Sequence, residues 1–220
     1  SIQANLTKNL DAMMDRQVDV MGWADTNLEW NDYSTYLMAQ RVFRKQYPGG
    51  KWLTTTSNIP SDTNLKPGGN ALGLNHDVTS RTTLTGRDSM GRWLWATLEG
   101  KTDSVTIVQL YVPGDPSTQG ITTTYAQQYE QIQITNRQIV PDVIGQYYRD
   151  LHNFLATLKS QLIVMGDFNE GSTDKHLMDL QTQHNLRDVY EMKHPDTPLN
   201  SHQMGTQRID HFLVSAPLIP

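Results

Sequence analysis

The sequence predicts an α/β (α+β) fold in which β-sheets are covered on their outer faces by helices. Strand-like and helix-like segments interleave along the chain, and several strands follow one another through short turns. Short turns join antiparallel strands, whereas a doubly wound parallel sheet needs a longer crossover between its strands. We therefore expect mixed or antiparallel sheets with helices outside.

The composition suits one large domain, and we treat residues 1–220 as a single unit. Hydrophobic residues make up 37% of the chain, with five Trp, nine Tyr and nine Met, which is enough for a sizeable core. The net charge of -5 argues against binding nucleic acid by bulk charge, so a phosphate-bearing partner must meet a local basic patch or a metal. The absence of Cys excludes a thiol nucleophile and fits an intracellular protein, a nuclear one included.

The expected strands are short apolar segments rich in β-branched or aromatic residues. Turns rich in Pro and Gly precede the strands expected at 51–56 and 71–74, and Pro113 with Gly114 ends the strand expected at 105–111. Gly73 indicates a close backbone approach within the third. The sixth is an unbroken apolar run, which predicts burial on both faces. The strands are expected at 18–23, 51–56, 71–74, 93–98, 105–111, 162–165 and 208–214.

The expected helices carry apolar residues at helical spacing. The longest begins near Val140, where Pro141 is acceptable in the first turn, and continues to Lys159. Asn5 is the expected cap of the first helix. The helices are expected at 5–14, 34–46, 121–134, 140–159 and 173–184. Residues 81–92 form the most basic segment of an acidic chain.

Polar residues stand at the ends of three expected strands. Asp167 and Asn169 follow the run 162–165, while Asp25 and Tyr111 end two other strands. A carboxylate at Asp167 can hold or deprotonate a water, and the amide of Asn169 can donate to a phosphoryl oxygen without adding charge. Asp and Asn are also favoured in turns and helix caps. These residues alone therefore leave a purely structural role open.

Asp210 adds a carboxylate within an apolar strand, where it is costly unless it is paired or binds a metal. With this residue, four segments resemble the endonuclease/exonuclease/phosphatase superfamily of metal-dependent phosphodiesterases, in the family's order. They are Val18-Asp-Val-Met-Gly-Trp-Ala-Asp-Thr-Asn27, Tyr111-Val-Pro113, Met165-Gly-Asp-Phe-Asn169 and Arg208-Ile-Asp-His-Phe-Leu-Val-Ser215. The sequences Trp-Ala-Asp-Thr-Asn, Gly-Arg92-Trp and Gly-Thr-Gln-Arg-Ile-Asp-His further resemble endonuclease-like open reading frames associated with retroelements.

The resemblance implies a four-layered α/β sandwich, with two mixed sheets face to face and helices outside. It implies cleavage of a P–O bond by water with Mg²⁺ or Mn²⁺ as cofactor. Asp25 would hold the metal, Asp167 would orient and deprotonate the water, and Asp210 would orient a catalytic His. Asn169 and Tyr111 would contact the phosphate. Further hypothetical substrate contacts are Asn27, Arg87, Arg92 and His202, of which the two arginines and the histidine are more simply explained as ordinary surface residues.

The sequence departs from the family pattern in three ways. Asp25 stands where the family has Glu, and Mg²⁺ demands near-ideal geometry from a side chain that is one methylene shorter. The family's first strand and its closing Ser-Asp-His are not found in 1–220, so we expect a domain of a longer polypeptide. His211 cannot replace the missing His, because neighbours on a strand point to opposite faces. We expect His211 to fill the place of the family's Tyr in the sandwich.

The leading hypothesis is a metal-dependent nuclease that acts on nucleic acid, first of all on DNA, without a membrane partner. Two alternatives stay open. One keeps the fold and changes the substrate to a phosphomonoester or a phosphoinositide, which suits the acidic chain. The other is a truncated or degenerate domain that binds a partner without catalysis.

Overall fold

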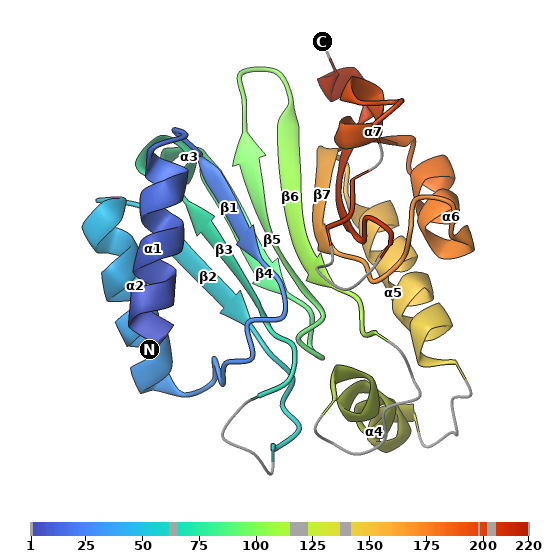
Figure 1. Ribbon diagram of the computed structural model, residues 1–220, viewed down its shortest axis with the longest axis horizontal. Helices are drawn as coiled ribbons and strands as arrows, with labels where there is room; N and C mark the ends of the chain where they lie inside the picture. Colours follow the sequence, from blue (N-terminus) through green and yellow to red (C-terminus); the bar gives the residue numbers. More distant parts are fainter. Residues whose placement is uncertain are drawn as a thin grey trace.

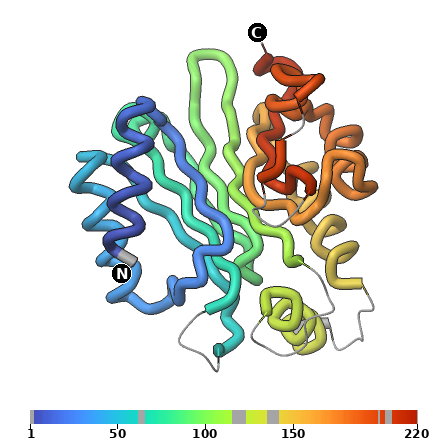
Figure 2. The backbone as a smooth tube through the Cα atoms, viewed as in Figure 1, coloured from blue at the N-terminus to red at the C-terminus, as the bar shows by residue number. Residues whose placement is uncertain are grey.

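The computed structural model describes residues 2–61, 66–114, 123–136, 142–197, 199–201 and 206–219. This part of the chain forms a three-stranded sheet and a six-stranded sheet, packed face to face with helices on the outside (Figure 1). The first part of the chain, blue to cyan in Figure 2, builds the small sheet with its helices, and the large sheet follows. The predicted four-layered sandwich is confirmed. None of the described helices is long and apolar enough to cross a bilayer.

The small sheet is antiparallel throughout and lies beneath two helices. Its order is β1 (Val20–Trp23), β3 (Asn70–Leu74) and β2 (Lys51–Thr55), covered by α1 (Ile2–Met14) and α2 (Tyr33–Gln46). Leu10 of α1 and Phe43 of α2 are fully buried against Met21 and Trp52 of the sheet. Gly73 is needed here, because a Cβ at this position would lie 2.6 Å from the Phe43 ring.

The large sheet is mixed, because only β6 and β7 run parallel among its pairs. Its order is β4 (Thr82–Arg87), β5 (Trp93–Glu99), β6 (Ser104–Tyr111), β7 (Gln161–Asp167), β9 (Asp210–Ser215) and β8 (Leu186–Asp188). The helices of this half are α4 (Thr124–Asn136), α5 (Val143–Thr157) and α6 (Lys175–Gln183). Short helices α3 (His76–Ser80) and α7 (Val189–Lys193) and a 3₁₀ turn at Ala216–Leu218 complete the described elements.

Alternation along β7 decides which side chains face the other sheet. Leu162 and Val164 belong to the core under α5 and α6. Ile163 and Met165 belong to the core between the two sheets. Because side chains on a strand alternate, Asp167 continues the inward-facing row of Ile163 and Met165. The sheet therefore directs this carboxylate towards the small sheet.

Several local predictions differ from the structure. The first helix begins at Ile2, so Asn5 lies within it and does not cap it. Strand β4 was not expected, because an edge strand with an exposed Leu84 and several Thr has no apolar face to mark it. Strand β8 has only three residues, too few for a periodic signal. Residue 121, the expected start of α4, and Pro141 lie outside the described residues.

Candidate active site

Three adjacent strands of the large sheet place Tyr111, Asp167 and Asp210 side by side. Tyr111 pairs with Asp167 in the β6–β7 register, and Asp167 pairs with Asp210 in the β7–β9 register. Asp210 is exposed, whereas its neighbour His211 is buried on the opposite face, as predicted. The strands thus bring together a phenol and two carboxylates that are 56 and 43 residues apart in sequence (167 − 111 and 210 − 167).

The turn after β7 fixes Asp167 and Asn169 relative to each other. Gly166 has a φ of 146°, and a Cβ there would lie 2.0 Å from the Leu110 carbonyl oxygen, so only glycine fits. Asn169 adopts a left-handed φ of 49°, and its backbone N–H donates to Asp167 Oδ1 over 2.9 Å. Its Nδ2 donates to the Val112 carbonyl over 2.7 Å. Asp167 and Asn169 therefore do form a turn, and the same turn fixes the two side chains that were predicted to act in the site.

Tyr111 lies at the centre of the group. Burial, and then the negative charges of Asp25 and Asp167, raise the pKa of Tyr111 to about 12. Its hydroxyl also forms side-chain hydrogen bonds with Asn169 and Thr124. Two consequences follow. Tyr111 keeps its proton at neutral pH and can donate a hydrogen bond. Asp25, from the loop after β1, and Asp167, from β7, are close enough to act on the same phenol.

Asp25 is held on a short loop that follows β1. Its φ of 47° is left-handed, a conformation that Asp tolerates better than most residues. Oδ1 accepts a hydrogen bond from the Gly68 N–H over 3.1 Å. Asn27, also left-handed at 53°, donates from its backbone to the Gly68 carbonyl and from Nδ2 to the Asp25 carbonyl. Within the described residues, Oδ2 of Asp25 accepts no hydrogen bond, so this oxygen is available to a ligand.

A groove of about 330 Å³ runs along the inward face beside these residues. Asp167 and Asp210 line it from the large sheet, and Gly22 and Ala24 line it from β1 and the loop that carries Asp25. Gly22 keeps the sheets close here, because a Cβ at this position would meet the Gln109 side chain at 1.8 Å. The groove therefore gives a substrate access to both carboxylates of the large sheet.

The remaining predicted site residues lie elsewhere. Arg92 is only 4% exposed, and its guanidinium is bonded to Asp88 and Asp150. Arg87 is exposed at the end of edge strand β4, where it lines a separate groove of about 480 Å³ with Tyr33. Asn27 belongs to the Asp25 loop, and its amide is used there. His202 lies outside the described residues.

Three contributors were not singled out by the sequence. Gly68 supplies the backbone N–H that holds Asp25, Thr124 bonds the Tyr111 hydroxyl, and the Ser201 hydroxyl accepts the N–H groups of Ile209 and Asp210 at 2.9 and 3.0 Å. The sequence indicated a turn at Pro67-Gly-Gly69, but nothing in it indicated that the Gly68 N–H binds Asp25. A hydroxyl in a Thr-rich or Pro-rich segment carries no pattern that indicates its partner.

The carboxylates of the site can hold a divalent metal only if that metal needs few protein ligands. Among the described residues, no three His, Cys, Asp or Glu side chains form a metal-binding group. A dedicated protein cage is thus not present in this part of the chain. Mg²⁺ needs only one or two carboxylates, since water and substrate phosphate complete its shell. Asp25, whose Oδ2 is available and whose charge acts on Tyr111 together with that of Asp167, fits that requirement.

No protein-family model and no curated protein sequence matches this chain. Several solved structures do match it. AP endonuclease LMAP from Leishmania major has a TM-score of 0.68 and 16% identity, covering 98% of this chain and 77% of that one. An AP endonuclease from Archaeoglobus fulgidus has a TM-score of 0.62 and 15% identity, covering 99% and 84%. An endonuclease/exonuclease/phosphatase family protein from Leptotrichia buccalis C-1013-b has a TM-score of 0.55 and 12% identity, covering 95% and 80%. At such identities these likenesses show a shared fold.

Proposed function

We propose that this chain, which has the endonuclease/exonuclease/phosphatase fold, is a divalent-metal-dependent phosphodiesterase that cleaves DNA. One observation carries the proposal. The register of β6, β7 and β9 aligns Tyr111, Asp167 and Asp210 on the inward face, and Asp25 acts on Tyr111 from the other sheet. Four segments of sequence that resembled a nuclease family thus converge on one end of the sandwich.

The metal is assigned to Asp25, whose Oδ2 is available while Oδ1 is anchored to Gly68. A bound Mg²⁺ or Mn²⁺ supplies Lewis-acid stabilisation of charge on the phosphoryl and leaving oxygens. Aspartate in place of glutamate shortens the reach of this ligand by one methylene. We expect metal binding that is weaker than a glutamate would provide, because Mg²⁺ tolerates little deviation from octahedral geometry.

Asp167 is the proposed general base. Its Oδ1 accepts the Asn169 N–H, which fixes the rotamer, and its carboxylate lines the groove where a water can approach the phosphate. The water loses its proton to this carboxylate as its oxygen attacks phosphorus, and the P–O bond to the leaving oxygen of the cleaved strand breaks, so that this oxygen departs with the bonding electron pair. The Asn169 amide donates to the Val112 carbonyl and bonds the Tyr111 hydroxyl, and we propose that a phosphoryl oxygen of the bound substrate takes the place of the hydroxyl as its second partner. Tyr111 donates a further hydrogen bond to the phosphate, since its raised pKa keeps it protonated.

Asp210 is assigned to orienting a histidine, as the resemblance implied. Its backbone is fixed by Ser201, and its exposed carboxylate lines the groove. His211 does not take the histidine's place, because it lies on the other face of β9. We propose that the histidine comes from elsewhere in a longer polypeptide.

The choice of DNA is supported by the AP endonucleases among the structural neighbours. An oligonucleotide duplex with one abasic site is therefore the first substrate to test. The narrower resemblance to retroelement-associated reading frames stays a prediction.

The test is cleavage of a labelled abasic duplex and nicking of supercoiled plasmid by the protein with its native flanking sequence. We expect strand cleavage with Mg²⁺ or Mn²⁺ that EDTA abolishes. Release of phosphate from phosphomonoesters or phosphoinositides in place of strand cleavage would assign the site to a phosphatase. Absence of both reactions would leave a binding domain and refute the proposal.

Metal binding is tested independently of turnover by calorimetry with Mn²⁺. Asp25→Ala should abolish the binding heat, and Asp25→Glu should tighten binding, because the longer carboxylate reaches the position that the fold provides. Equal Mn²⁺ affinity for the native protein and both variants would remove Asp25 from the metal site.

A further inference from the structure

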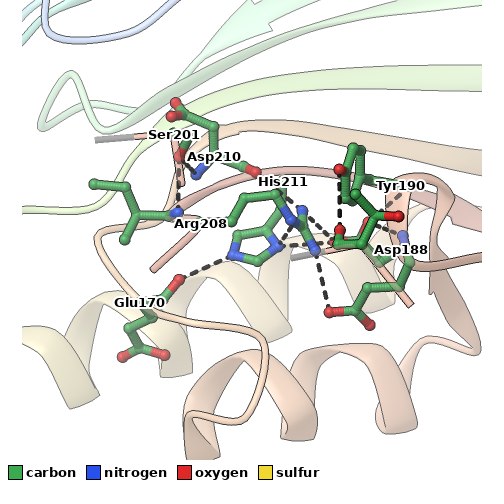
Figure 3. Close-up of polar contacts among 10 residues, drawn as sticks. Glu170, Asp188, Tyr190, Ser201, Arg208, Asp210 and His211 are labelled. Atoms are coloured by element: carbon green, nitrogen blue, oxygen red, sulfur yellow. Dashed lines mark hydrogen bonds and ion pairs between the residues drawn. The ribbon is translucent and has the colours of Figure 1, made fainter. Parts of the chain in front are cut away.

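A buried network behind the active site joins β9, β8 and the Asp167 turn (Figure 3). His211 lies at its centre with a fully buried side chain. Its Nδ1 is 2.8 Å from Asp188 Oδ2, and its Nε2 is 2.9 Å from the Glu170 carbonyl oxygen. The imidazole edge also packs against Phe168. The His211 ring thus connects Asp188, the last residue of β8, with the turn that carries Asp167 and Asn169.

The Glu170 carbonyl fixes the hydrogen-bond role of one ring nitrogen. The Glu170 carbonyl can only accept, so Nε2 carries a hydrogen and donates it. Asp188 is likewise an acceptor: burial alone would raise its pKa, but hydrogen bonds from His211 and Arg208 hold the pKa of Asp188 below its usual value. Arg208 Nη1 also lies 2.9 Å from Nδ1, but it donates to Asp188 Oδ2 and to the Asp210 carbonyl, at 2.9 and 3.1 Å. Nδ1 thus lies within hydrogen-bond distance of both Asp188 Oδ2 and Arg208 Nη1, whereas Nε2 faces the Glu170 carbonyl alone.

Arg208 completes the network on the side of Asp210. Its guanidinium pairs with Asp188 and Glu191 and lies over the Tyr190 ring, 5.1 Å from the centroid. Asp188 in turn caps α7 by accepting the Tyr190 N–H over 2.9 Å. The buried charges of Arg208 and Asp188 are paired here, which satisfies the requirement for buried charges. The network holds the backbone of both strands that present the active-site carboxylates.

We propose that His211 is a positioning residue, whose Nε2–H to the Glu170 carbonyl holds the Gly166–Glu170 turn in its reactive geometry. This inference rests on the proposed function for its kinetic effect. His211 is one of the residues that line the groove, but its side chain is fully buried, so the imidazole is not exposed to a substrate there. It acts on the reaction through the placement of Asp167 and Asn169. The turn is also held by the Phe168 N–H, which donates to the Ile209 carbonyl, and by the pairing of Gly166 with β6. Loss of the His211 hydrogen bond should therefore shift the turn slightly without unfolding it.

Two amide substitutions separate the two hydrogen bonds. The amide nitrogen of His211→Asn lies near the Nδ1 position, so this variant keeps a donor to Asp188 and loses the bond to Glu170. The amide nitrogen of His211→Gln reaches the Nε2 position, so it keeps the bond to Glu170 and loses that to Asp188. Both remove one hydrogen bond and the ring, so a merely structural role predicts equal effects on activity.

The experiment measures kcat and KM on the abasic duplex, with rates corrected for the folded fraction from urea denaturation. We expect His211→Asn to lower kcat about 10- to 100-fold with KM within threefold, because small misplacement of reacting groups has effects of that size. His211→Gln should stay within threefold of the native kcat. Equal kcat in both variants, or a native kcat in folded His211→Asn, would overturn the proposal. If His211→Asn does not fold, His211→Phe, which keeps a ring against Phe168 without a donor, takes its place.

Hydrogen exchange makes the inference testable even if the proposed activity fails. Amide exchange of residues 166–170, followed by mass spectrometry, should accelerate at least tenfold in His211→Asn and remain near native in His211→Gln. A protein that does not cleave but shows this difference refutes the phosphodiesterase proposal alone. Unchanged exchange in His211→Asn refutes the positioning role, whatever the activity.

Discussion

Arg92 and Arg87 look alike in the sequence, and the structure predicts opposite consequences of replacing them. Arg92→Met removes a guanidinium that is 4% exposed and bonded to Asp88 through Nε and Nη2, at 2.9 and 3.0 Å, and to Asp150 through Nη1, at 2.7 Å. Arg87→Met removes a guanidinium that is exposed and that forms no ion pair within the described residues. The pair is a matched comparison of one substitution in two environments.

The magnitude follows from what Arg92 leaves behind. The Asp88 side chain is only 7% exposed and would keep a charge without its partner, whereas Asp150, 28% exposed, can be rehydrated. Breaking a buried ion pair from one side lowers the free energy of unfolding by about 3 to 5 kcal/mol. Loss of the guanidinium over Trp93, 4.4 Å from the ring centroid, adds to this. For Arg87→Met we expect a change within about 0.5 kcal/mol, as for most surface substitutions.

Urea denaturation followed by circular dichroism measures both variants. With an m value of about 2 kcal/mol per M, Arg92→Met should lower the midpoint by about 1.5 to 2.5 M. Asp88→Asn in the Arg92→Met background should recover part of the loss, because it removes the unpaired charge. A loss below about 1 kcal/mol for Arg92→Met, or the same loss as for Arg87→Met, would refute the argument that the ion pair is the main contribution.

Three further outcomes are expected. Gly166→Ala should lower the free energy of unfolding by about 2 kcal/mol or more in urea titrations, because its φ of 146° and its contact with a strand carbonyl exclude a Cβ; unchanged stability would contradict that geometry. Asp167→Asn should lower the pKa of Tyr111 from about 12, as measured by NMR of ¹³C-labelled tyrosine. Because the pKa of Tyr111 in the folded protein exceeds the unfolded value of 10.0, its contribution to the free energy of unfolding is complete below pH 10 and is lost as the pH rises towards 12. Burial lowers the pKa of His152 and of His184, whose ring nitrogens are 3.0 Å apart, so the urea midpoint should fall as the pH drops below 6.5; replacing both by Leu should remove that part of the pH dependence.

The fold was predictable where periodicity was strong. The run Leu162–Met165 and the helix near 143–157 carry unambiguous patterns, and both are confirmed. Edge strand β4 and the three-residue β8 escaped prediction, because an exposed edge does not need an apolar face and three residues cannot show a period. Packing between distant segments decides these elements.

The site was predictable to the extent that its residues end strands. Tyr111 and Asp167 end their strands, as predicted, whereas Asp210 was predicted within a strand and in fact begins β9, where it is exposed; register then makes the three residues neighbours. The two arginines were not separable by sequence, because only the fold shows which of them lies against Asp88 and Asp150. The role of His211 was partly predictable: alternation placed it opposite Asp210, but its hydrogen bond to the Glu170 carbonyl involves a backbone oxygen that no sequence pattern marks.

The most direct test of the proposed site is the single-turnover cleavage rate of Asp167→Asn on the abasic duplex at saturating Mn²⁺. Asparagine keeps the shape and an acceptor for the Asn169 N–H but cannot take a proton from water. Asp15→Asn, which changes an exposed carboxylate directly after α1, is the matched control. The account predicts a loss of about 100- to 10,000-fold for Asp167→Asn, the range of general-base contributions, and a native rate for the control. A rate within tenfold of the native protein for Asp167→Asn would contradict the assignment.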